Sequence, residues 1–217
     1  MTLHHLLALE MAFFLAGNST PKSPAVLGIV GQAHRAHVNT SAASEGTTVY
    51  DGDQFSTEAG GMLRLRGGAA ALDLAEKSEL LVRSTGNGAQ EIAAELIKGT
   101  VIFSAEHQAA QIVAREARIR PAAEARTMAQ VSIVGPKELR IYARRGSLKF
   151  SYRGESEVVA EGKSYRVILD PAEDDSKTNG AIKPSRPPKA FLFIIFGGEL
   201  GVIGFEIWHE LQSPDRP

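Results

Sequence analysis

Apolar and polar residues alternate along most of the middle of this chain, as they do in half-buried β-strands. In Met62–Arg66, Leu63 and Leu65 would face one side and the two arginines the other. The same alternation recurs in five further segments, 72–74, 131–133, 139–141, 148–152 and 165–169. The pattern therefore predicts an all-β domain over residues 25–170.

Turn-forming residues separate the predicted strands at intervals of roughly ten residues. They are Asp51-Gly52-Asp53, Gly60-Gly61, Gly67-Gly68, Asn87-Gly88, Gly135-Pro136 and Gly162. This spacing is typical of an elongated roll, a solenoid or a sandwich of short antiparallel strands. We expect at least about nine strands between Val26 and Leu169. Only residues 89–97 could form a helix there, and they are few.

The N-terminal segment, residues 1–24, contains a short apolar run. Leu15-Ala16-Gly17 supplies small residues for signal-peptide cleavage, whereas Glu10 and the lack of a preceding Lys or Arg are atypical of a signal. Two interpretations stay open, a secretory signal peptide and an amphipathic N-terminal helix.

After residue 170 the alternation ends. Residues 171–189 are acidic and then basic and proline-rich, a composition that predicts an extended linker. Residues 190–210 are mostly apolar, and residues 190–208 would be roughly 28 Å long as a helix, close to the thickness of a bilayer core. The segment is therefore a candidate transmembrane helix, followed by a tail at 211–217. An ordinary helix docked on the β domain is the alternative.

Within this candidate helix, Gly197 and Gly201 have the small-xxx-small spacing that permits close helix contact. Glu199 and Glu206 are seven residues apart and would share one helical face. They are candidates for contact with a partner helix. In a simple anchor they would be tolerated by protonation or by reaching toward the interface.

Composition excludes several kinds of chemistry. The chain has no cysteine, so disulfides, thiolate nucleophiles and cysteine metal ligands are excluded. Its 24 Lys and Arg balance 25 Asp and Glu, which gives no overall field that favours nucleic acid. His34 and His37 would point to opposite faces of a strand and make a poor metal pair. We therefore expect no cofactor, no metal and no catalytic residue.

Two polar features remain. Asp51-Gly52-Asp53 is interpreted as a structural turn rather than a catalytic or metal site, because Gly and Asp both suit tight turns. Arginines on the outward positions of predicted strands could form a basic stripe, and with acids nearby they are interpreted as a mixed solvated surface. These arginines are Arg64, Arg66, Arg115, Arg118, Arg120, Arg140, Arg144 and Arg145.

Residues 45–80 and 97–103 together resemble the FecR-like domain. The matching features are the Gly52-Asp53 turn with Phe55 and Thr57, the glycine-marked turn at Gly60, the alternating strand 62–66, Ser78-Glu-Leu80, and Ile97-x-Gly-Thr-Val-x-Phe103. The resemblance implies an envelope-facing β-rich module for protein contacts or signalling. The family's namesake places a cytoplasmic anti-sigma segment and a membrane helix before the domain. Here the hydrophobic candidate follows it, as in FecR-domain proteins that end in a membrane anchor.

We therefore expect a non-catalytic binding or scaffolding module, tethered to a membrane through residues 190–208, with a protein or another envelope component as its partner. A regulatory protein that relays a binding event to a partner is the main alternative. An envelope polysaccharide-modifying enzyme is a weaker one, because it needs a cleft with convergent carboxylates. The resemblance favours a periplasmic or otherwise extracytoplasmic domain. The basic residues in 183–189 would favour a cytoplasmic one by the positive-inside rule.

Overall fold

A computed structural model describes residues 24–85, 91–171 and 190–196, and these form an all-β fold without a helix. This confirms the predicted fold class. Fourteen strands lie between Val26 and Leu169, and a fifteenth follows. They are β1 (Val26–Val38), β2 (Ser41–Ala42), β3 (Thr48–Tyr50), β4 (Gln54–Gly67), β5 (Ala70–Leu74), β6 (Glu79–Ser84), β7 (Ile92–Ala105), β8 (Ala110–Ala114), β9 (Ala117–Pro121), β10 (Thr127–Gly135), β11 (Glu138–Arg145), β12 (Leu148–Tyr152), β13 (Glu155–Val159), β14 (Lys163–Leu169) and β15 (Phe191–Phe196).

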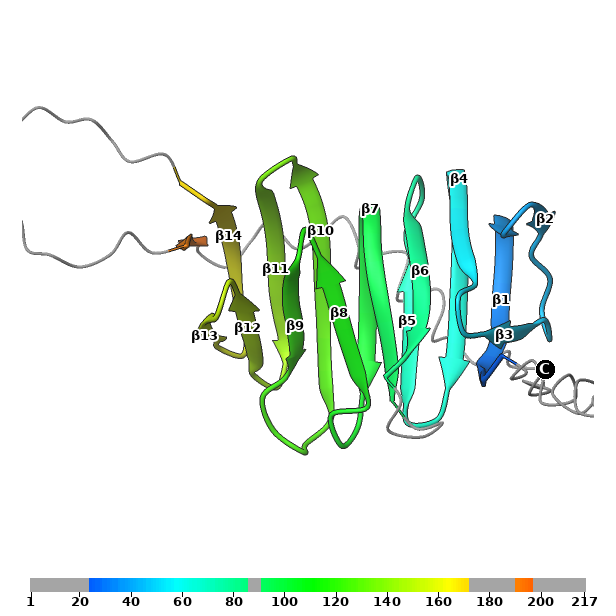
Figure 1. Cartoon of the computed structure of the whole chain (residues 1–217), viewed down its shortest axis with the longest axis horizontal. Helices are drawn as coiled ribbons and strands as arrows, with labels where there is room; N and C mark the ends of the chain where they lie inside the picture. Colours follow the sequence, from blue (N-terminus) through cyan, green and yellow to red (C-terminus); the bar gives the residue numbers. More distant parts are fainter. Residues whose placement is uncertain (1–23, 86–90, 172–189, 197–217) are drawn as a thin grey trace, which may run out of the picture.

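The strands form a flattened roll of two layers (Figure 1). One layer has the order β1-β4-β5-β7-β10-β11-β14-β15, and the other has the order β1-β4-β6-β7-β8-β9-β12-β13. The long strands β1, β4 and β7 belong to both layers, because each bends part-way along its length.

The bends occur where the backbone takes unusual conformations. In β7, Gly99 has a φ of +79°, and the pairing changes there from β6 and β8 to β5 and β10. In β1, Arg35 has a φ of +44° at a register shift. It faces the part of β4 that holds Gly60, whose φ is +67°. A positive φ turns the chain, and glycine adopts it without a Cβ penalty.

One strand pair departs from the predicted antiparallel arrangement. β8 runs parallel to the first half of β7. The reason is that the chain ends β7 in one layer and returns through residues 106–109 to the other layer. β8 therefore starts beside Ile92, where β7 also started.

The hydrophobic core lies between the layers. Alternate residues of β5, β8 and β12 are buried, as the period-two pattern predicts. The largest side chains with almost no exposed surface are Phe55, Phe103, Phe150, Leu63, Leu65, Leu72, Leu74, Leu80, Leu96, Ile112, Ile119 and Leu139.

At residues 191–196 the structure has a strand where the predicted C-terminal helix would begin, and the rest of that segment lies outside the described residues. Phe191–Phe196 form β15, which pairs antiparallel with β14 from Leu169↔Phe191 to Ser164↔Phe196. The strand is favoured because it hydrogen-bonds the edge of β14 and places Phe191 over the core. The sheet thus extends past the predicted domain end at residue 170. Residues 89–97 are also not a helix from Ile92 onward, since β7 begins there.

Several predicted segments fall outside the described residues. They are most of the N-terminal segment (1–23), the linker from residue 172 to 189, the remainder of the candidate helix (197–210) and the tail (211–217). The described ranges contain no helix that is long and apolar enough to cross a bilayer.

Candidate functional site

The two layers end together at β13 and β15, which we call the open end of the roll (Figure 1). In the part of the chain that the structure describes, β13 pairs only with β12, and β15 pairs only with β14. Each therefore has one strand edge whose backbone N–H and C=O groups face away from the sheet.

An aromatic cluster closes the core beneath this end. The ring centroid of Phe150 lies 4.9 Å from that of Phe191 and 5.1 Å from that of Phe193. Phe193 also lies 5.3 Å from Tyr165. All three pairs meet edge to face, the arrangement that aromatic quadrupoles favour. β15 is thus anchored to the core by its inward side chains.

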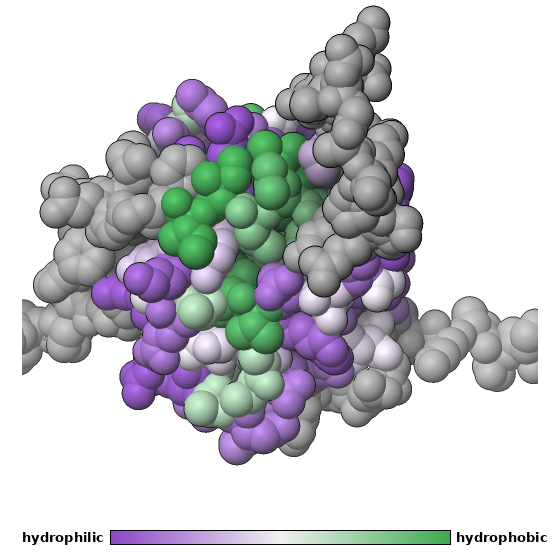
Figure 2. Space-filling model, turned by 90° about the vertical axis from the view of Figure 1, so that its left-hand side faces the viewer, coloured by the Kyte–Doolittle hydropathy of each residue, from purple (hydrophilic) through white to green (hydrophobic). Residues whose placement is uncertain are grey.

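Three large apolar side chains are exposed on the two end strands. Ile195 is 61% exposed, Val158 is 56% exposed and Leu192 is 47% exposed. Figure 2 looks onto this end and shows hydrophobic residues gathered into a patch bordered by hydrophilic ones. An exposed apolar patch with a polar border is typical of a protein-interaction surface.

A polar frame holds the open end together. The hydroxyl of Tyr152 donates to an Asp170 carboxylate oxygen at 3.0 Å, and Arg153 pairs with the same carboxylate at 2.7 Å. Burial, and then the hydrogen bond to Asp170, raise the pKa of Tyr152 above its ordinary value. Asp170 N–H donates to the carbonyl of Ala190 at 2.8 Å, and Ala190 N–H donates to Glu155 at 3.3 Å. These bonds fix where β15 enters the sheet.

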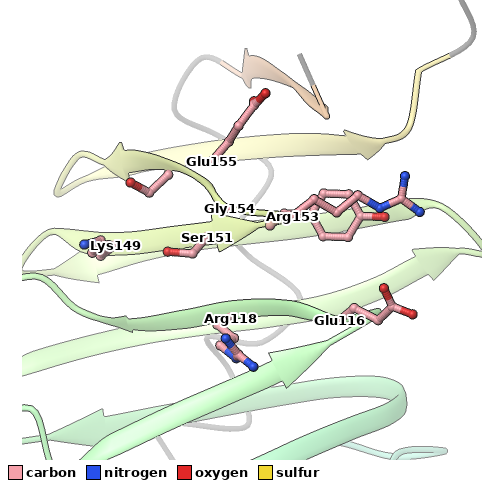
Figure 3. Close-up of a pocket in the computed structure, with 9 residues that line it drawn as sticks. Glu116, Arg118, Lys149, Ser151, Arg153, Gly154 and Glu155 are labelled. Atoms are coloured by element: carbon pink, nitrogen blue, oxygen red, sulfur yellow. The ribbon is translucent and has the colours of Figure 1, made fainter. Parts of the chain in front are cut away.

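A polar hollow of about 230 Å³ lies beside the open end, between the β8–β9 and β12–β13 turns (Figure 3). Arg118, Lys149, Ser151 and Ser156 are among its lining residues. A second hollow of about 320 Å³ contains Arg120, His107 and Glu124. In it, His107 lies 3.7 Å from Glu124.

The predicted Asp51-Gly52-Asp53 turn lies between β3 and β4, away from the open end in strand order. Gly52 has a φ of +93°. Asp53 accepts from the N–H of Tyr50 at 2.8 Å and from the side-chain amide of Asn39 at 2.9 Å. Asp51 accepts from the N–H of Ser84 at 2.9 Å. These hydrogen bonds tie β3, β4 and β6 together.

The other predicted residues are four that lie outside the described ranges and one pair of histidines. Gly197, Glu199, Gly201 and Glu206 lie outside the described residues. A bulge at Arg35 separates His34 from His37, so strict alternation does not hold between them. The described ranges contain no group of three His, Cys, Asp or Glu that could hold a metal ion.

Sequence reasoning missed two features, the strand β15 and the grouping of cations on β9 and β12. The run Phe191–Phe196 is uninterrupted by polar residues, a pattern that fits a buried strand as well as part of a helix. Its length together with residues 197–208 favoured the helix. The neighbourhood of Arg118, Arg120 and Lys149 depends on strand register between β9 and β12, which no local pattern encodes.

Among known proteins, this chain matches only solved structures, and only in part. No protein-family model matches the chain, and no curated protein matches it. Two crystal structures of a proposed anti-sigma factor from Parabacteroides distasonis match in part. They have TM-scores of 0.39 and 0.41 and are each 10% identical, over 59% and 68% of this chain. The matched region spans only 54% and 60% of those chains. At this level of similarity no role is transferred to this chain.

Proposed function

We propose that the roll is a non-catalytic protein-binding module whose partner adds an extended strand to the outer edge of β15. The observation that supports this most directly is the character of that edge. Phe191–Phe196 is apolar throughout, contains no charge and no proline, and pairs with β14 without a register shift. Native proteins usually protect an edge strand with charges, prolines or bulges.

Strand addition fits this edge better than a small-molecule site does. The open backbone groups of β15 supply hydrogen bonds to an extended peptide. Leu192 and Ile195 are exposed apolar side chains of this strand, and because they are three residues apart they point to opposite faces of it. The hollow beside this end is lined mainly by polar side chains, so it does not continue the apolar patch.

The resemblance to FecR-like domains supports the same proposal, because it implies an envelope module for protein contacts. An extracytoplasmic location is part of this proposal, whereas a membrane tether through residues 190–208 is not, because residues 191–196 form the binding strand β15. The regulatory alternative would need contacts of Glu199 and Glu206, and no described feature favours it over simple binding.

The test is site-specific crosslinking in cells that produce the full chain. A photoreactive phenylalanine analogue replaces Leu192 or Ile195, and Ile29 of β1, which is 48% exposed, serves as the matched control. We expect a protein adduct from 192 or 195 and none from 29. The adduct should disappear when Ile195→Lys is added to the Leu192 probe, because a charge on the edge opposes strand pairing.

Hydrogen exchange then distinguishes strand addition from another contact. The partner identified by crosslinking is purified and added to the full chain. The backbone amides of β15 should then exchange more slowly. Adducts of equal yield from position 29, or unchanged exchange in β15, would contradict the proposal.

A further inference from the structure

Two cations on the strands of this protein are matched by an acid directly opposite on the neighbouring strand. Arg64 and Asp73 are direct partners in β4 and β5, with Nε and Oδ1 2.6 Å apart. Lys98 and Glu79 are direct partners in β7 and β6, with Nζ and Oε2 3.0 Å apart. Opposite charges across a strand pair stabilise it, and like charges destabilise it.

The pairing of β9 with β12 instead places two cations directly opposite each other. Arg140 and Arg166 are also direct partners in β11 and β14, but there Glu138 forms an ion pair with Arg166. Lys149 is the direct partner of Arg120, and both lie on the outer face because their neighbours Ile119 and Leu148 are buried. Arg118 lies two residues along β9 on the same face, opposite Ser151. Within the described ranges, none of these three cations has a hydrogen bond or an ion pair.

Serine hydroxyl groups lie on the same outer face of the sheet. Ser151 is the direct partner of Ser156 in β13, and both line the hollow of about 230 Å³ together with Arg118 and Lys149. Figure 3 shows Lys149, Ser151 and Arg118 on neighbouring strands at this hollow. Two acids, Glu116 and Glu155, also line this hollow, and Glu155 accepts a hydrogen bond from Ala190. Arg120 lines the hollow of about 320 Å³ instead, together with Glu91 and Glu124.

We propose that Arg118, Arg120 and Lys149 bind a phosphate group, either as the free ion or as part of a lipid headgroup. An arginine fork presents two parallel donors to such an oxyanion, and lysine adds a point charge. Serine hydroxyls supply further donors. A bound dianion would also remove the cross-strand repulsion between Arg120 and Lys149. This site does not depend on strand addition at β15.

The first arm uses the full chain and inorganic phosphate. Melting temperature is measured in phosphate and in sodium chloride of equal ionic strength. The test variant is Arg118→Gln/Arg120→Gln/Lys149→Gln, and the control is Arg83→Gln, an exposed cation of β6 in the same layer. Wild type and the control should melt higher in phosphate, and each lost cation should weaken binding by roughly fivefold or more.

The second arm measures sedimentation with phosphatidylcholine vesicles, with and without phosphatidylglycerol. Binding that needs the anionic lipid and is reduced in the triple variant but not in Arg83→Gln identifies a headgroup as the source. A response to phosphate alone identifies the free ion. If neither arm separates the triple variant from the control, the proposal is wrong.

A stability measurement tests whether the three cations have a purely structural role. At low salt without phosphate, the triple variant should be at least as stable to urea as wild type, because three unneutralised cations are removed. A clear loss of stability under these conditions would show that the cations support the fold, and would overturn the proposal.

Discussion

Thr57, Ser78 and Thr100 are joined by hydrogen bonds where β7 passes from one layer to the other. Thr57 Oγ1 accepts from the N–H of Ser78 at 3.0 Å, and Ser78 Oγ accepts from the N–H of Thr100 at 2.9 Å. Ser78 is fully buried. Thr57, Ser78 and Thr100 are among the positions that resemble the FecR-like domain. The residues that match the FecR-like pattern at these positions therefore hydrogen-bond the backbone where the strands join.

Gly99, next to this junction, has surroundings that differ from those of Gly52. Both have positive φ, +79° and +93°. A Cβ at Gly99 would lie 2.6 Å from the Cα of Ser78, whereas a Cβ at Gly52 would have no atom within 4 Å. Gly99 is therefore required for both its φ and its close approach, and Gly52 for its φ alone.

We predict that Gly99→Ala lowers the free energy of unfolding by about 3 kcal/mol or more, and Gly52→Ala by about 1 kcal/mol. The extra loss at Gly99 comes from displacing Ser78 and its buried hydrogen bonds. Urea unfolding of the two variants beside wild type measures the difference. Equal losses would show that the junction yields easily to an added methyl group.

At the scale of elements, two neighbouring hairpins use turns of the same kind with different residues. The β8–β9 turn has Arg115 and Glu116 between the partners Ala114 and Ala117, with φ values of +50° and +67°. The β12–β13 turn has Arg153 and Gly154, with φ values of +47° and +84°. Two central residues with positive φ define a type I′ turn, for which Asn-Gly is the preferred sequence. The β8–β9 turn lacks both preferred residues.

We predict that Arg115→Asn/Glu116→Gly raises the free energy of unfolding by about 1 kcal/mol, because both residues then suit a left-handed backbone. Arg153→Asn is the comparison, and its gain should be smaller, since Gly154 is already present and the Arg153–Asp170 ion pair is lost. Chemical denaturation of both variants provides the measurement. A less stable double variant would mean that Arg115 or Glu116 makes contacts that outweigh its strain.

For the whole molecule, the assignment of Phe191–Phe196 as a strand determines how much of the C-terminal apolar stretch is left to form a membrane helix. With β15 in the sheet, the apolar stretch from 197 to 208 keeps about twelve residues, fewer than the roughly 20 needed to span a bilayer as a helix. A membrane helix that begins at residue 190 and the strand β15 therefore exclude each other.

We predict that Phe191→Ala in the full chain lowers the free energy of unfolding of the roll by about 3–5 kcal/mol, as for other buried phenylalanines. Leu192→Ala, at a half-exposed neighbouring position, should cost about 1 kcal/mol or less. Thermal and urea unfolding in detergent-free buffer would compare the two. If both variants unfold like wild type, residues 191–196 are not part of the folded sheet.

The sequence by itself determined the fold class and most strand positions, because alternation and turn residues act within a few neighbours. Leu63 and Leu65 had to be buried together in any half-buried strand, and both are. The Gly52 turn was readable for the same reason. The sequence did not reveal that β1, β4 and β7 each belong to both layers. That is seen only from the strands with which each of them pairs.

Tertiary structure alone decided the features that carry the two proposals. An apolar run such as Phe191–Phe196 suits a helix or a strand, and the free edge of β14 above Phe150 and Tyr165 selected the strand. Arg120 and Lys149 are 29 residues apart in sequence and become neighbours only through the register of β9 with β12. Register is set by the fit of many side chains across the core, so it cannot be deduced from either strand separately.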